Sequence, residues 1–492
     1  MNTEAVLSEI RAYAEKRPLF LLSEVLKNTG TASEIHEILS AVRPYLVGMY
    51  LGARKTPDDA EVFWITAPSY RPGKSESERF EKSLQDAGVP GPLNHLIEDY
   101  IRKKTGKRWD DPQVLERIRG AVVAQKDSYW KEGEGRVIRY IKGYSVLGYL
   151  AYQFPVYFVQ FQHVMKYLAD EGLLKQRMVV LDAGTGPGTV PLAIIESLRY
   201  LRCSALIYGV EQSEEHAEAY SMLVPAYAEG GKTVVGDLFN EDIITFDPSQ
   251  IPATIDLMVF SNVLNELGDL TPDKRADLVL RLSEALAEDG TIVLLEPADL
   301  ANSTMLRQLS LLLKRHGLTI YSPCPSIWRG RCKVKRCWSF VEYPEIQRPP
   351  LMKKLMNCKE SYRYDNTDIK FTYVIIRKDE RVCCRVSIPK DRNYFRLSSM
   401  GEYVGEKTDV IVSVISGDLG NPKNAIYRIC DGTGRKETYA ILPRIYADKS
   451  GLLLKNASYG DLLALNGVKV MYNPDHDAYN LLITRTASIQ YL

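Results

Sequence analysis

Short apolar runs alternate with longer amphipathic segments between residues 178 and 297. The apolar runs predict five strands, at 178–182, 205–211, 233–237, 255–261 and 291–297. The segments between them have the length and periodicity of helices, as in 272–290. This alternation is typical of an α/β protein with a doubly wound parallel sheet. A helix at 300–316 and two strands at 318–322 and 370–378 are then expected to complete the sheet at one edge.

The rest of the chain predicts further domains. Helical periodicity followed by a strand-like run at 61–67 makes 1–115 an N-terminal helical region, with a winged-helix-like module as one form of it. Five strand candidates separated by turn residues predict a small β-barrel at 395–492. The α/β domain then spans 116–380, with an insertion at 323–369 between its last two strands.

One apolar stretch, 143–165, contains no charged residue. It does contain Pro155, His163 and several glutamines, which a lone membrane helix would bury at a cost. We therefore expect two buried helical pieces broken at the proline, and no membrane association. The tyrosines in and before these helices are expected to pack in the core rather than to stack on RNA: Tyr140, Tyr144, Tyr149, Tyr152 and Tyr157.

Composition narrows the class of function. The 492 residues suggest two to four domains, and the net charge of +1 excludes a global attraction to nucleic acid, so any such binding needs a local patch. The N-terminus has early acidic residues and no apolar h-region, which favours a cytoplasmic location. In a reducing compartment, clustered cysteines among the eight present indicate metal or redox chemistry more often than disulfides.

A glycine-rich loop follows the first strand of the predicted sheet. Asp182, Gly184, Gly186 and Gly188 form D-x-G-x-G-x-G, where a dinucleotide fold requires G-x-G-x-x-G. The acid and this spacing resemble the class I S-adenosylmethionine (SAM) methyltransferases, in which the loop wraps the methionine part of SAM. A glycine-rich turn in a domain that binds nothing and a nicotinamide site are the alternatives.

The ends of the next strands carry further candidates for holding SAM. Glu211, followed by Gln212, can accept hydrogen bonds from both ribose hydroxyls. Asp237 and Leu238 end the third strand, where the methyltransferase family meets the adenine. Asn262 follows the fourth strand. Four such features in order predict a SAM site.

The segment 260–267 (FSNVLNEL) lies where class I enzymes present their chemistry to the methyl acceptor. It lacks both the N/D-P-P-Y/F pattern of base-amine methylases and the Pro-Cys thiol of cytosine-C5 enzymes. Asn262 and Glu266 could bind SAM or the acceptor, and Glu266 could equally cap the following helix. No catalytic residue is assigned, since orientation of donor and acceptor supplies most of the rate in many methyl transfers.

The insertion opens with three cysteines in the pattern C-x7-C-x4-C. Cys324, Cys332 and Cys337 are followed further on by Cys358, and no pair shows the C-x2-C spacing of common zinc sites. Four thiolates also suit a cubane iron–sulfur cluster, often with a proline beside one ligand, as in Cys324-Pro325. Scattered free cysteines and a catalytic thiol remain alternatives.

The same insertion is strongly basic. Residues 300–341 contain eight lysines and arginines and no acid. Such cations lower thiol pKa values and can hold phosphates. The candidate RNA-binding residues lie between and beside the cysteines: Arg329, Arg331, Lys333, Lys335 and Arg336.

Five features in order make a specific resemblance: the loop 182–188, the phrase SNVLNEL, the strand end LLEP, a Cys-Pro opening a four-cysteine insertion, and KFTYVIIRK. Over residues 130–380 the chain resembles the methyltransferase-like assembly factors of the small ribosomal subunit, known in mitochondria with bacterial and archaeal relatives. This implies a doubly wound, Rossmann-like class I methyltransferase sheet and binding to the maturing small subunit and its ribosomal RNA.

The resemblance also implies a cofactor set. It assigns SAM and a 4Fe–4S cluster, the latter on Cys324, Cys332, Cys337 and Cys358, with zinc as the alternative. The chain departs from the family in having Cys337-Trp338-Ser339-Phe340 where relatives commonly have Cys-His-Phe, and in a wider spacing of its first two cysteines.

The C-terminal barrel resembles OB-fold nucleic-acid binders in its turn at 429–434. Candidates for a basic groove with aromatic platforms are Tyr427, Tyr439, Tyr446, Arg428, Arg435 and Arg444, unless the tyrosines pack the barrel. Together these features predict a SAM-binding, iron–sulfur protein that acts on small-subunit ribosomal RNA as a methyltransferase, an assembly factor or both. The alternatives are a non-catalytic assembly factor and a non-RNA methyltransferase. A monomer is favoured.

Overall fold

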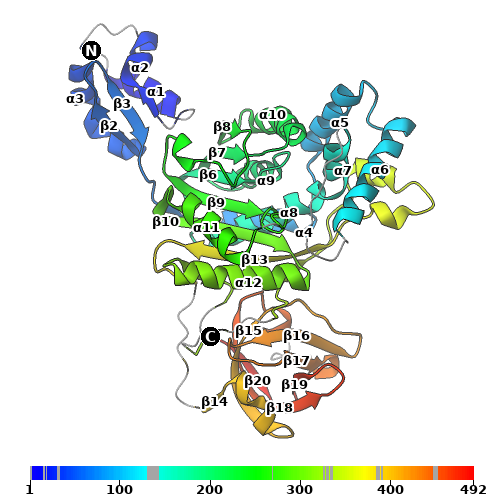
Figure 1. Cartoon of the computed structure of the whole chain (residues 1–492). Helices are drawn as coiled ribbons and strands as arrows, with labels where there is room; N and C mark the ends of the chain where they lie inside the picture. The colour runs from blue at the N-terminus through cyan, green and yellow to red at the C-terminus, as the bar shows by residue number, and fades with distance from the viewer. Residues whose placement is uncertain are drawn as a thin grey trace. The chain divides into compact units, whose positions relative to one another are not determined.

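The structure is a computed structural model of the chain. It describes residues 3–14, 17, 19–29, 34–129, 143–268, 270–324, 327–328, 332, 336–383, 388, 392–446 and 453–492. These residues divide into two compact units. Figure 1 labels helices and strands of the chain. The first comprises Met1–Asp269, Leu278–Ile292 and Glu345–Thr367. The second comprises Leu270–Asp277, Val293–Pro344 and Asp368–Leu492.

A small α/β module begins the first unit. Its elements are α1 (Thr3–Ala14), β1 (Leu19–Leu21), α2 (Leu22–Thr29), α3 (Ile35–Leu46), η1 (Val47–Met49), β2 (Leu51–Lys55) and β3 (Ala60–Trp64). The strands pair antiparallel in the order β1-β3-β2, and apolar residues such as Val6, Ile38 and Val62 form one core with them. The order α-β-α-α-β-β is typical of winged-helix modules, and that assignment stays a prediction.

A helical region follows, joined by the short strand pair β4 (Ser69–Tyr70) and β5 (Leu174–Lys175). Its helices are α4 (Lys74–Gln85), α5 (Gly91–Thr105), α6 (Pro112–Tyr129), α7 (Ser145–Tyr152) and α8 (Phe154–Asp170). The uncharged run is broken as expected, since α7 ends at Tyr152 and Pro155 occupies the first turn of α8, where a missing N–H costs nothing. Among the described residues no helix is long and apolar enough to cross a membrane.

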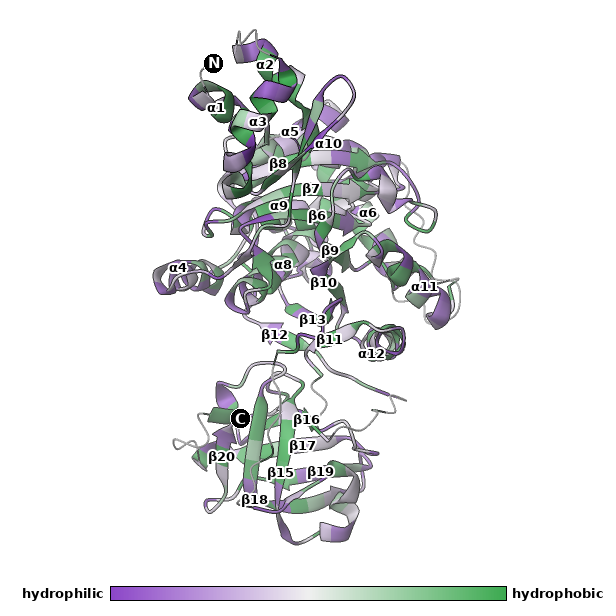
Figure 2. Ribbon diagram, turned by 90° about the vertical axis from the view of Figure 1, so that its left-hand side faces the viewer, coloured by the Kyte–Doolittle hydropathy of each residue, from purple (hydrophilic) through white to green (hydrophobic). Residues whose placement is uncertain are grey.

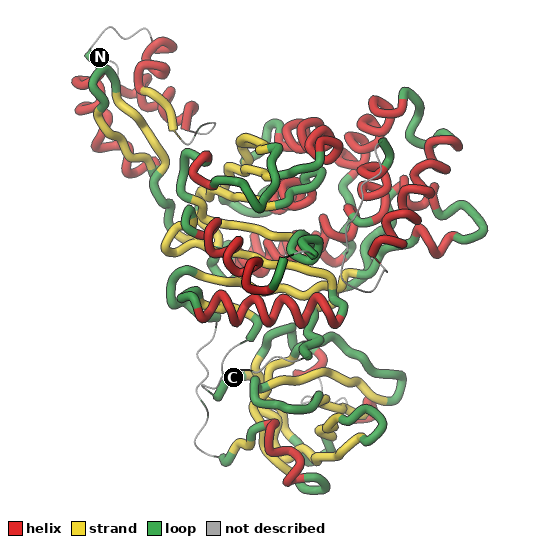
Figure 3. Tube along the Cα trace, in the orientation of Figure 1, coloured by secondary structure: helices red, strands yellow, loops and turns green. Residues whose placement is uncertain are grey.

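The central sheet confirms the predicted strands and their alternation with helices. Its elements are β6 (Arg177–Ala183), α9 (Thr189–Ser197), β7 (Ser204–Val210), α10 (Glu214–Ala228), β8 (Thr233–Phe239), η2 (Pro248–Gln250), β9 (Ile255–Ser261), α11 (Pro272–Ser283), β10 (Leu286–Pro297), α12 (Leu300–Arg315), β11 (Thr319–Ser322) and β13 (Ile369–Arg377). The strand order is β11-β13-β10-β9-β6-β7-β8. Strands β6 to β9 pair in parallel, whereas β11 and β13 pair antiparallel at one edge. Figure 3 shows the alternation of strands and helices along the trace.

Burial explains why the sequence forms this sheet. Every residue of β6 after Arg177 is buried, as are the first six residues of β9, and both strands are rich in valine, leucine and isoleucine. Continuous apolar runs of this kind are expected when helices cover both faces of a parallel sheet. Figure 2 shows the strands as largely hydrophobic and the surrounding helices as mixed.

The expected insertion between the last two strands contains three further elements: β12 (Val341–Tyr343), α13 (Pro350–Leu355) and η3 (Ser361–Tyr364). Strand β12 pairs antiparallel with β13, which adds an eighth strand to the sheet. Elsewhere the main difference from the sequence-based expectation is β10, which begins at Leu286 rather than at Thr291.

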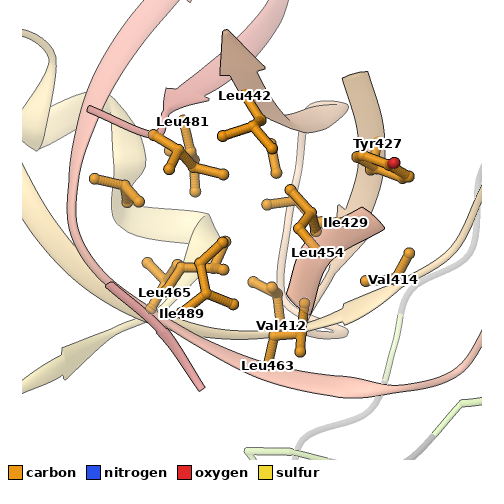
Figure 4. Close-up of a cluster of buried hydrophobic side chains, with 14 of the residues drawn as sticks. Val412, Val414, Tyr427, Ile429, Leu442, Leu454, Leu463, Leu465, Leu481 and Ile489 are labelled. Carbon is orange, nitrogen blue, oxygen red and sulfur yellow. The ribbon is translucent and has the colours of Figure 1, made fainter. Parts of the chain in front are cut away.

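The C-terminal region is a closed barrel, as predicted. Its elements are β14 (Tyr394–Phe395), η4 (Leu397–Tyr403), β15 (Lys407–Val414), β16 (Asn424–Cys430), β17 (Thr438–Pro443), η5 (Arg444–Tyr446), β18 (Leu462–Asn473), β19 (Ala478–Leu482) and β20 (Ser488–Tyr491). Five strands close in the order β15-β16-β17-β19-β18-β15, with β17 and β19 parallel. This is the strand order of an OB-fold. Its core residues include Val412, Ile429, Leu463 and Leu481 (Figure 4).

Candidate functional site

The carboxyl ends of four neighbouring parallel strands bring the predicted SAM residues to one edge of the sheet. The order β9-β6-β7-β8 places Asp182 opposite Gly209 on one side and Val259 on the other. Gly209 in turn pairs with Leu238 of β8. In doubly wound sheets ligands bind at this edge, where the order of strands reverses. The topology therefore assembles the candidates that the sequence identified separately.

The glycine loop between β6 and α9 has three residues in the left-handed region. The φ angles are 80° at Gly184, 57° at Gly186 and 91° at Gly188. A Cβ atom on Gly184 would lie 2.5 Å from Val263 Cγ2, and one on Gly188 would lie 2.2 Å from Val224 Cγ2. At Gly186 the described residues beyond its two chain neighbours place no atom within 4 Å of that position. The loop therefore packs tightly at both ends and leaves open space at its middle.

Glu211 fastens this loop to β7. Its Oε2 accepts a hydrogen bond from the backbone N–H of Gly186 at 2.8 Å, and its Oε1 accepts one from Ser213 at 2.7 Å. Burial raises the pKa of Glu211, and these backbone donors oppose the rise. Because two carboxylate oxygens offer about four acceptor positions, lone pairs remain for ligand hydroxyl groups.

Asp182 is only 1% exposed. Its Oδ2 has no hydrogen-bond partner within the described part of the chain. The pKa of Asp182 is raised to about 7, mainly by burial and to a smaller extent by the nearby Glu211 carboxylate, while an interaction with the Thr185 side chain opposes the rise. A buried carboxylate oxygen without a partner is costly, and a ligand bearing an ammonium group would satisfy it.

The remaining predicted SAM residues differ in exposure. Gln212 and Asp237 are exposed, and Leu238 is half-buried beside Gly209. Asn262, at the end of β9, adopts a left-handed backbone with φ 56°, a conformation that asparagine tolerates better than most residues. Its Nδ2 donates to Ser261 Oγ at 3.3 Å, and its buried Oδ1 has no partner among the described residues.

Glu266 lies in a turn and does not cap the next helix. Helix α11 begins at Pro272, and the residue before it, Thr271, accepts a hydrogen bond at its Oγ1 from the backbone N–H of Lys274 at 3.3 Å. Thr271 therefore occupies the capping position. The other role expected for Glu266, contact with SAM or the acceptor, stays a prediction.

Tyr149 is a site residue that the sequence did not reveal. Its hydroxyl lies 3.2 Å from Oγ1 of Thr189, the residue directly after the glycine loop, and its ring lies 5.6 Å from that of His216. Burial raises the pKa of Tyr149, and the carboxylates of Glu266, Asp182 and Glu211 raise it further. A tyrosine thus joins the three acidic side chains of the site. In the sequence, the one signal for the burial of Tyr149 is its position in an uncharged helical segment.

In the second unit, cysteines from the insertion and from the barrel line one pocket of about 280 Å³. They are Cys324, Cys332, Cys337 and Cys430. As whole residues Cys324 and Cys332 are exposed, whereas Cys337 and Cys430 are partly buried. The pKa of each of Cys324, Cys332 and Cys430 is nevertheless raised, first by desolvation of the sulfur and further by the neighbouring Cys337. Within the described residues no three potential ligands converge closely enough to hold a metal ion. The structure therefore shows the shared pocket and not a formed metal site.

Cys430 is the cysteine of this pocket that the sequence-based set omitted. It ends β16, and its Sγ accepts a hydrogen bond from the backbone N–H of Gly432 at 3.3 Å. The next residue, Asp431, accepts hydrogen bonds from the backbone N–H of Leu397 at 2.8 Å and from Trp328 Nε1 at 3.0 Å. The turn that carries the thiol is thereby fixed to the barrel and to the insertion.

The other predicted ligand and the predicted cations are placed differently. Cys358 is an exposed residue of the first unit, shortly after α13. Arg336 is exposed and lies 3.9 Å from Glu437. The remaining candidates for RNA binding lie outside the described residues, namely Arg329, Arg331, Lys333 and Lys335.

Three of the barrel residues proposed for an RNA platform make contacts within the barrel or with the insertion. Tyr427 is 4% exposed and belongs to the core (Figure 4). Arg428 is also 4% exposed, donates to the carbonyl of Trp338 at 2.5 Å and pairs with Glu437 at 3.2 Å. Tyr439 donates to the same glutamate at 2.7 Å. Of these side chains, Arg428 links the insertion to β16.

The other platform candidates are more varied. Arg444 pairs with Asp418 at 2.6 Å, and Tyr446 packs against the barrel core. Arg435 is exposed. RNA binding by these barrel residues stays a prediction.

The sheet topology and the glycine loop define the class of the central domain, an α/β domain of the SAM-dependent methyltransferase type. A family model described as "Mitochondrial small ribosomal subunit Rsm22" matches residues 143–414, more than half of the chain, and the chain belongs to this family. Residues 398–492 match a C-terminal domain of unknown function, DUF8157. No curated protein matches the chain at a significant level.

Solved structures resemble this chain only distantly. A methyltransferase candidate from Thermoplasma acidophilum is 13% identical with a TM-score of 0.27, over 42% of this chain and 70% of the other. A SAM-dependent methyltransferase from Clostridium acetobutylicum is 11% identical with a TM-score of 0.27, over 44% of this chain and 90% of the other. The small RNA methyltransferase HEN1 is 11% identical with a TM-score of 0.30, over 48% of this chain and 27% of the other. Likenesses with such TM-scores carry no argument about substrate.

Proposed function

We propose that this chain binds SAM and acts on the RNA of the small ribosomal subunit, as a methyltransferase. The observation that carries the proposal is the strand edge at which the glycine loop, Asp182, Glu211 and Asn262 meet. Membership of a family named for the small ribosomal subunit supports the partner. When bound, SAM supplies an electrophilic methyl group.

In this proposal the residues of the chain bind and orient. The methionine part of SAM enters the open space at Gly186. Its ammonium group donates a hydrogen bond to the unpartnered Oδ2 of Asp182. Glu211 accepts from ribose hydroxyls, while Asp237 and Leu238 contact the adenine. The free Oδ1 of Asn262 accepts a hydrogen bond from SAM or from the acceptor base. We assign no general base.

The cysteine pocket is proposed to hold a metal centre, as a 4Fe–4S cluster or, alternatively, as zinc. Four thiols around one pocket match the ligand number of either centre, and the N–H of Gly432 directed at Cys430 Sγ is the kind of second-sphere hydrogen bond that tunes such ligands. We propose Cys324, Cys332, Cys337 and Cys430 as the ligands. A bound metal would crosslink the insertion to the barrel.

A non-catalytic assembly factor is the second candidate. The segment after β9 lacks the acceptor motifs of known base methylases, and this observation favours a protein that uses SAM and the metal for structure only. A monomeric state stays part of the proposal. So does the cytoplasmic location, although the matched family is named for mitochondria.

Charge reversal tests the RNA partner. We expect Arg329→Glu, Arg331→Glu and Lys335→Glu together to weaken binding to small-subunit RNA at least tenfold at moderate salt, because each lost phosphate contact reduces counterion release. Gel-shift titration at several salt concentrations measures the effect. The control reverses three exposed lysines on other elements, Lys27, Lys55 and Lys103, which gives the same change in net charge. Equal RNA affinity of both variants would instead favour a small-molecule or protein substrate.

A further inference from the structure

A buried arginine lies beside the cysteine pocket. Arg307 of α12 is 2% exposed and lines the pocket together with the thiols. Its Nε donates to Ser339 Oγ at 3.0 Å, and its Nη2 donates to Thr372 Oγ1 at 3.2 Å. Nη2 also donates to the hydroxyl of Tyr459. One guanidinium therefore joins α12, the insertion, β13 and the barrel.

The hydrogen bonds of Arg307 leave its charge uncompensated. Among the described residues no carboxylate forms an ion pair with it, and its Nη1 has no hydrogen-bond partner. Tyr459 does not supply a negative charge near neutral pH, because burial raises the pKa of its hydroxyl to about 12 even though Arg307 lowers it. An isolated buried cation is costly unless an anion lies close to it.

The pocket also contains the carboxylate of Asp431, which accepts hydrogen bonds from Trp328, Leu397 and Thr433 and forms no ion pair with Arg307 among the described residues. The other groups that can carry negative charge beside Arg307 are the cysteine sulfurs, which become thiolates when they bind a metal. Negative charge on Cys324 or Cys337 would stabilise the protonated guanidinium electrostatically. A metal centre on four thiolates carries a net negative charge, and its reduction adds another electron. Two other cations on the pocket wall, Lys314 and Arg315, are exposed, so water and salt screen them.

We propose that Arg307 is the internal counter-charge of the metal centre in this pocket and sets its reduction potential. This inference rests on the metal centre proposed above. A buried cation favours the reduced, more negative state of a cluster, because the low dielectric of the surroundings strengthens the attraction. The hydrogen bond from Arg307 to the hydroxyl of Tyr459 also connects this counter-charge to the barrel.

The test is a redox titration of anaerobically purified protein, followed by electron paramagnetic resonance and combined with iron and sulfide analysis. We expect Arg307→Gln to lower the midpoint potential and to lose iron faster in air. Lys314→Gln, the matched control on the same pocket wall, is expected to keep the wild-type potential. Arg307→Lys retains the charge and should stay closer to wild type than the glutamine variant. Circular dichroism reports whether each variant folds.

If Arg307→Gln does not fold, Arg307→Met takes its place, because it removes the charge without leaving buried polar atoms. An unchanged potential in a folded, cluster-containing neutral variant would overturn the role of Arg307 and leave the metal centre standing. Equal shifts for the Arg307 and Lys314 variants would also overturn it. Wild-type protein without a redox-active cluster would contradict both the iron–sulfur assignment and this inference.

Discussion

Replacing Gly188 by alanine is expected to destabilise the protein by about 2–5 kcal/mol and to weaken SAM binding at least tenfold. A left-handed backbone costs an alanine about 1–2 kcal/mol, and overpacking a dense core costs about 1–3 kcal/mol. Both costs apply, since φ is 91° and the new Cβ would lie 2.2 Å from Val224 Cγ2. Valine on a helix has little rotameric freedom with which to move away. Chemical denaturation and calorimetric titration with SAM measure the two effects.

Two other glycines separate packing from binding. Gly186 and Gly106 both have positive φ, at 57° and 68°. In the described part of the chain, apart from their chain neighbours, no atom lies within 4 Å of a Cβ built on either glycine. Alanine at either position is therefore expected to cost only about 1–2 kcal/mol of stability. Gly186→Ala should also weaken SAM binding, because its methyl group enters the open space of the loop, whereas Gly106→Ala at the end of α5 should not. Normal SAM binding by Gly186→Ala would contradict the proposed position of the ligand.

Replacing Cys430 by serine is expected to remove most of the bound metal and to lower the thermal stability of the protein. Four ligands hold either proposed centre, so the loss of one leaves it incomplete and open to solvent. Because metal binding and folding are coupled in such sites, the barrel loses a crosslink to the insertion. Metal analysis, the visible spectrum and a melting curve of anaerobically purified protein measure these changes.

The matched control is Cys358→Ser. Cys358 is the fourth ligand that the family resemblance implied, whereas Cys430 is the fourth cysteine on the wall of the pocket. We expect Cys358→Ser to keep its metal and its melting temperature. The reverse result, in which Cys358→Ser loses the metal and Cys430→Ser retains it, would restore the sequence-based ligand set and remove the barrel from the site.

The central sheet could be predicted because its signals are local. Each strand from β6 to β9 is a short apolar run, and a candidate SAM-binding residue lies at or just beyond its carboxyl end. Once the strands are parallel, their ends meet at one edge, so the positions of Asp182 and Glu211 relative to each other follow from the topology. The closed barrel was predictable for a similar reason, since alternating residues such as Tyr427 and Ile429 face its core.

The contents of the cysteine pocket could not be predicted because they depend on contacts between distant segments. Cys430 is the last residue of an ordinary barrel strand, and nothing near it in the chain matches the insertion. The sequence around Cys430, Cys-Asp-Gly, is typical of a hairpin turn between two strands. It does not distinguish a metal ligand from an ordinary turn residue. The role of Arg428 shows the same limit, because its partner Trp338 lies in a segment far away along the chain.

Transfer of a labelled methyl group from SAM to RNA tests the central claim most directly. Purified chain is incubated with radiolabelled SAM and small ribosomal subunits or their precursor RNA, and incorporation is compared with that of Gly188→Ala. The proposed function predicts label in small-subunit RNA with the wild type and little with the variant. Stable binding of SAM and RNA without incorporation would contradict the methyltransferase assignment and establish the chain as a non-catalytic assembly factor.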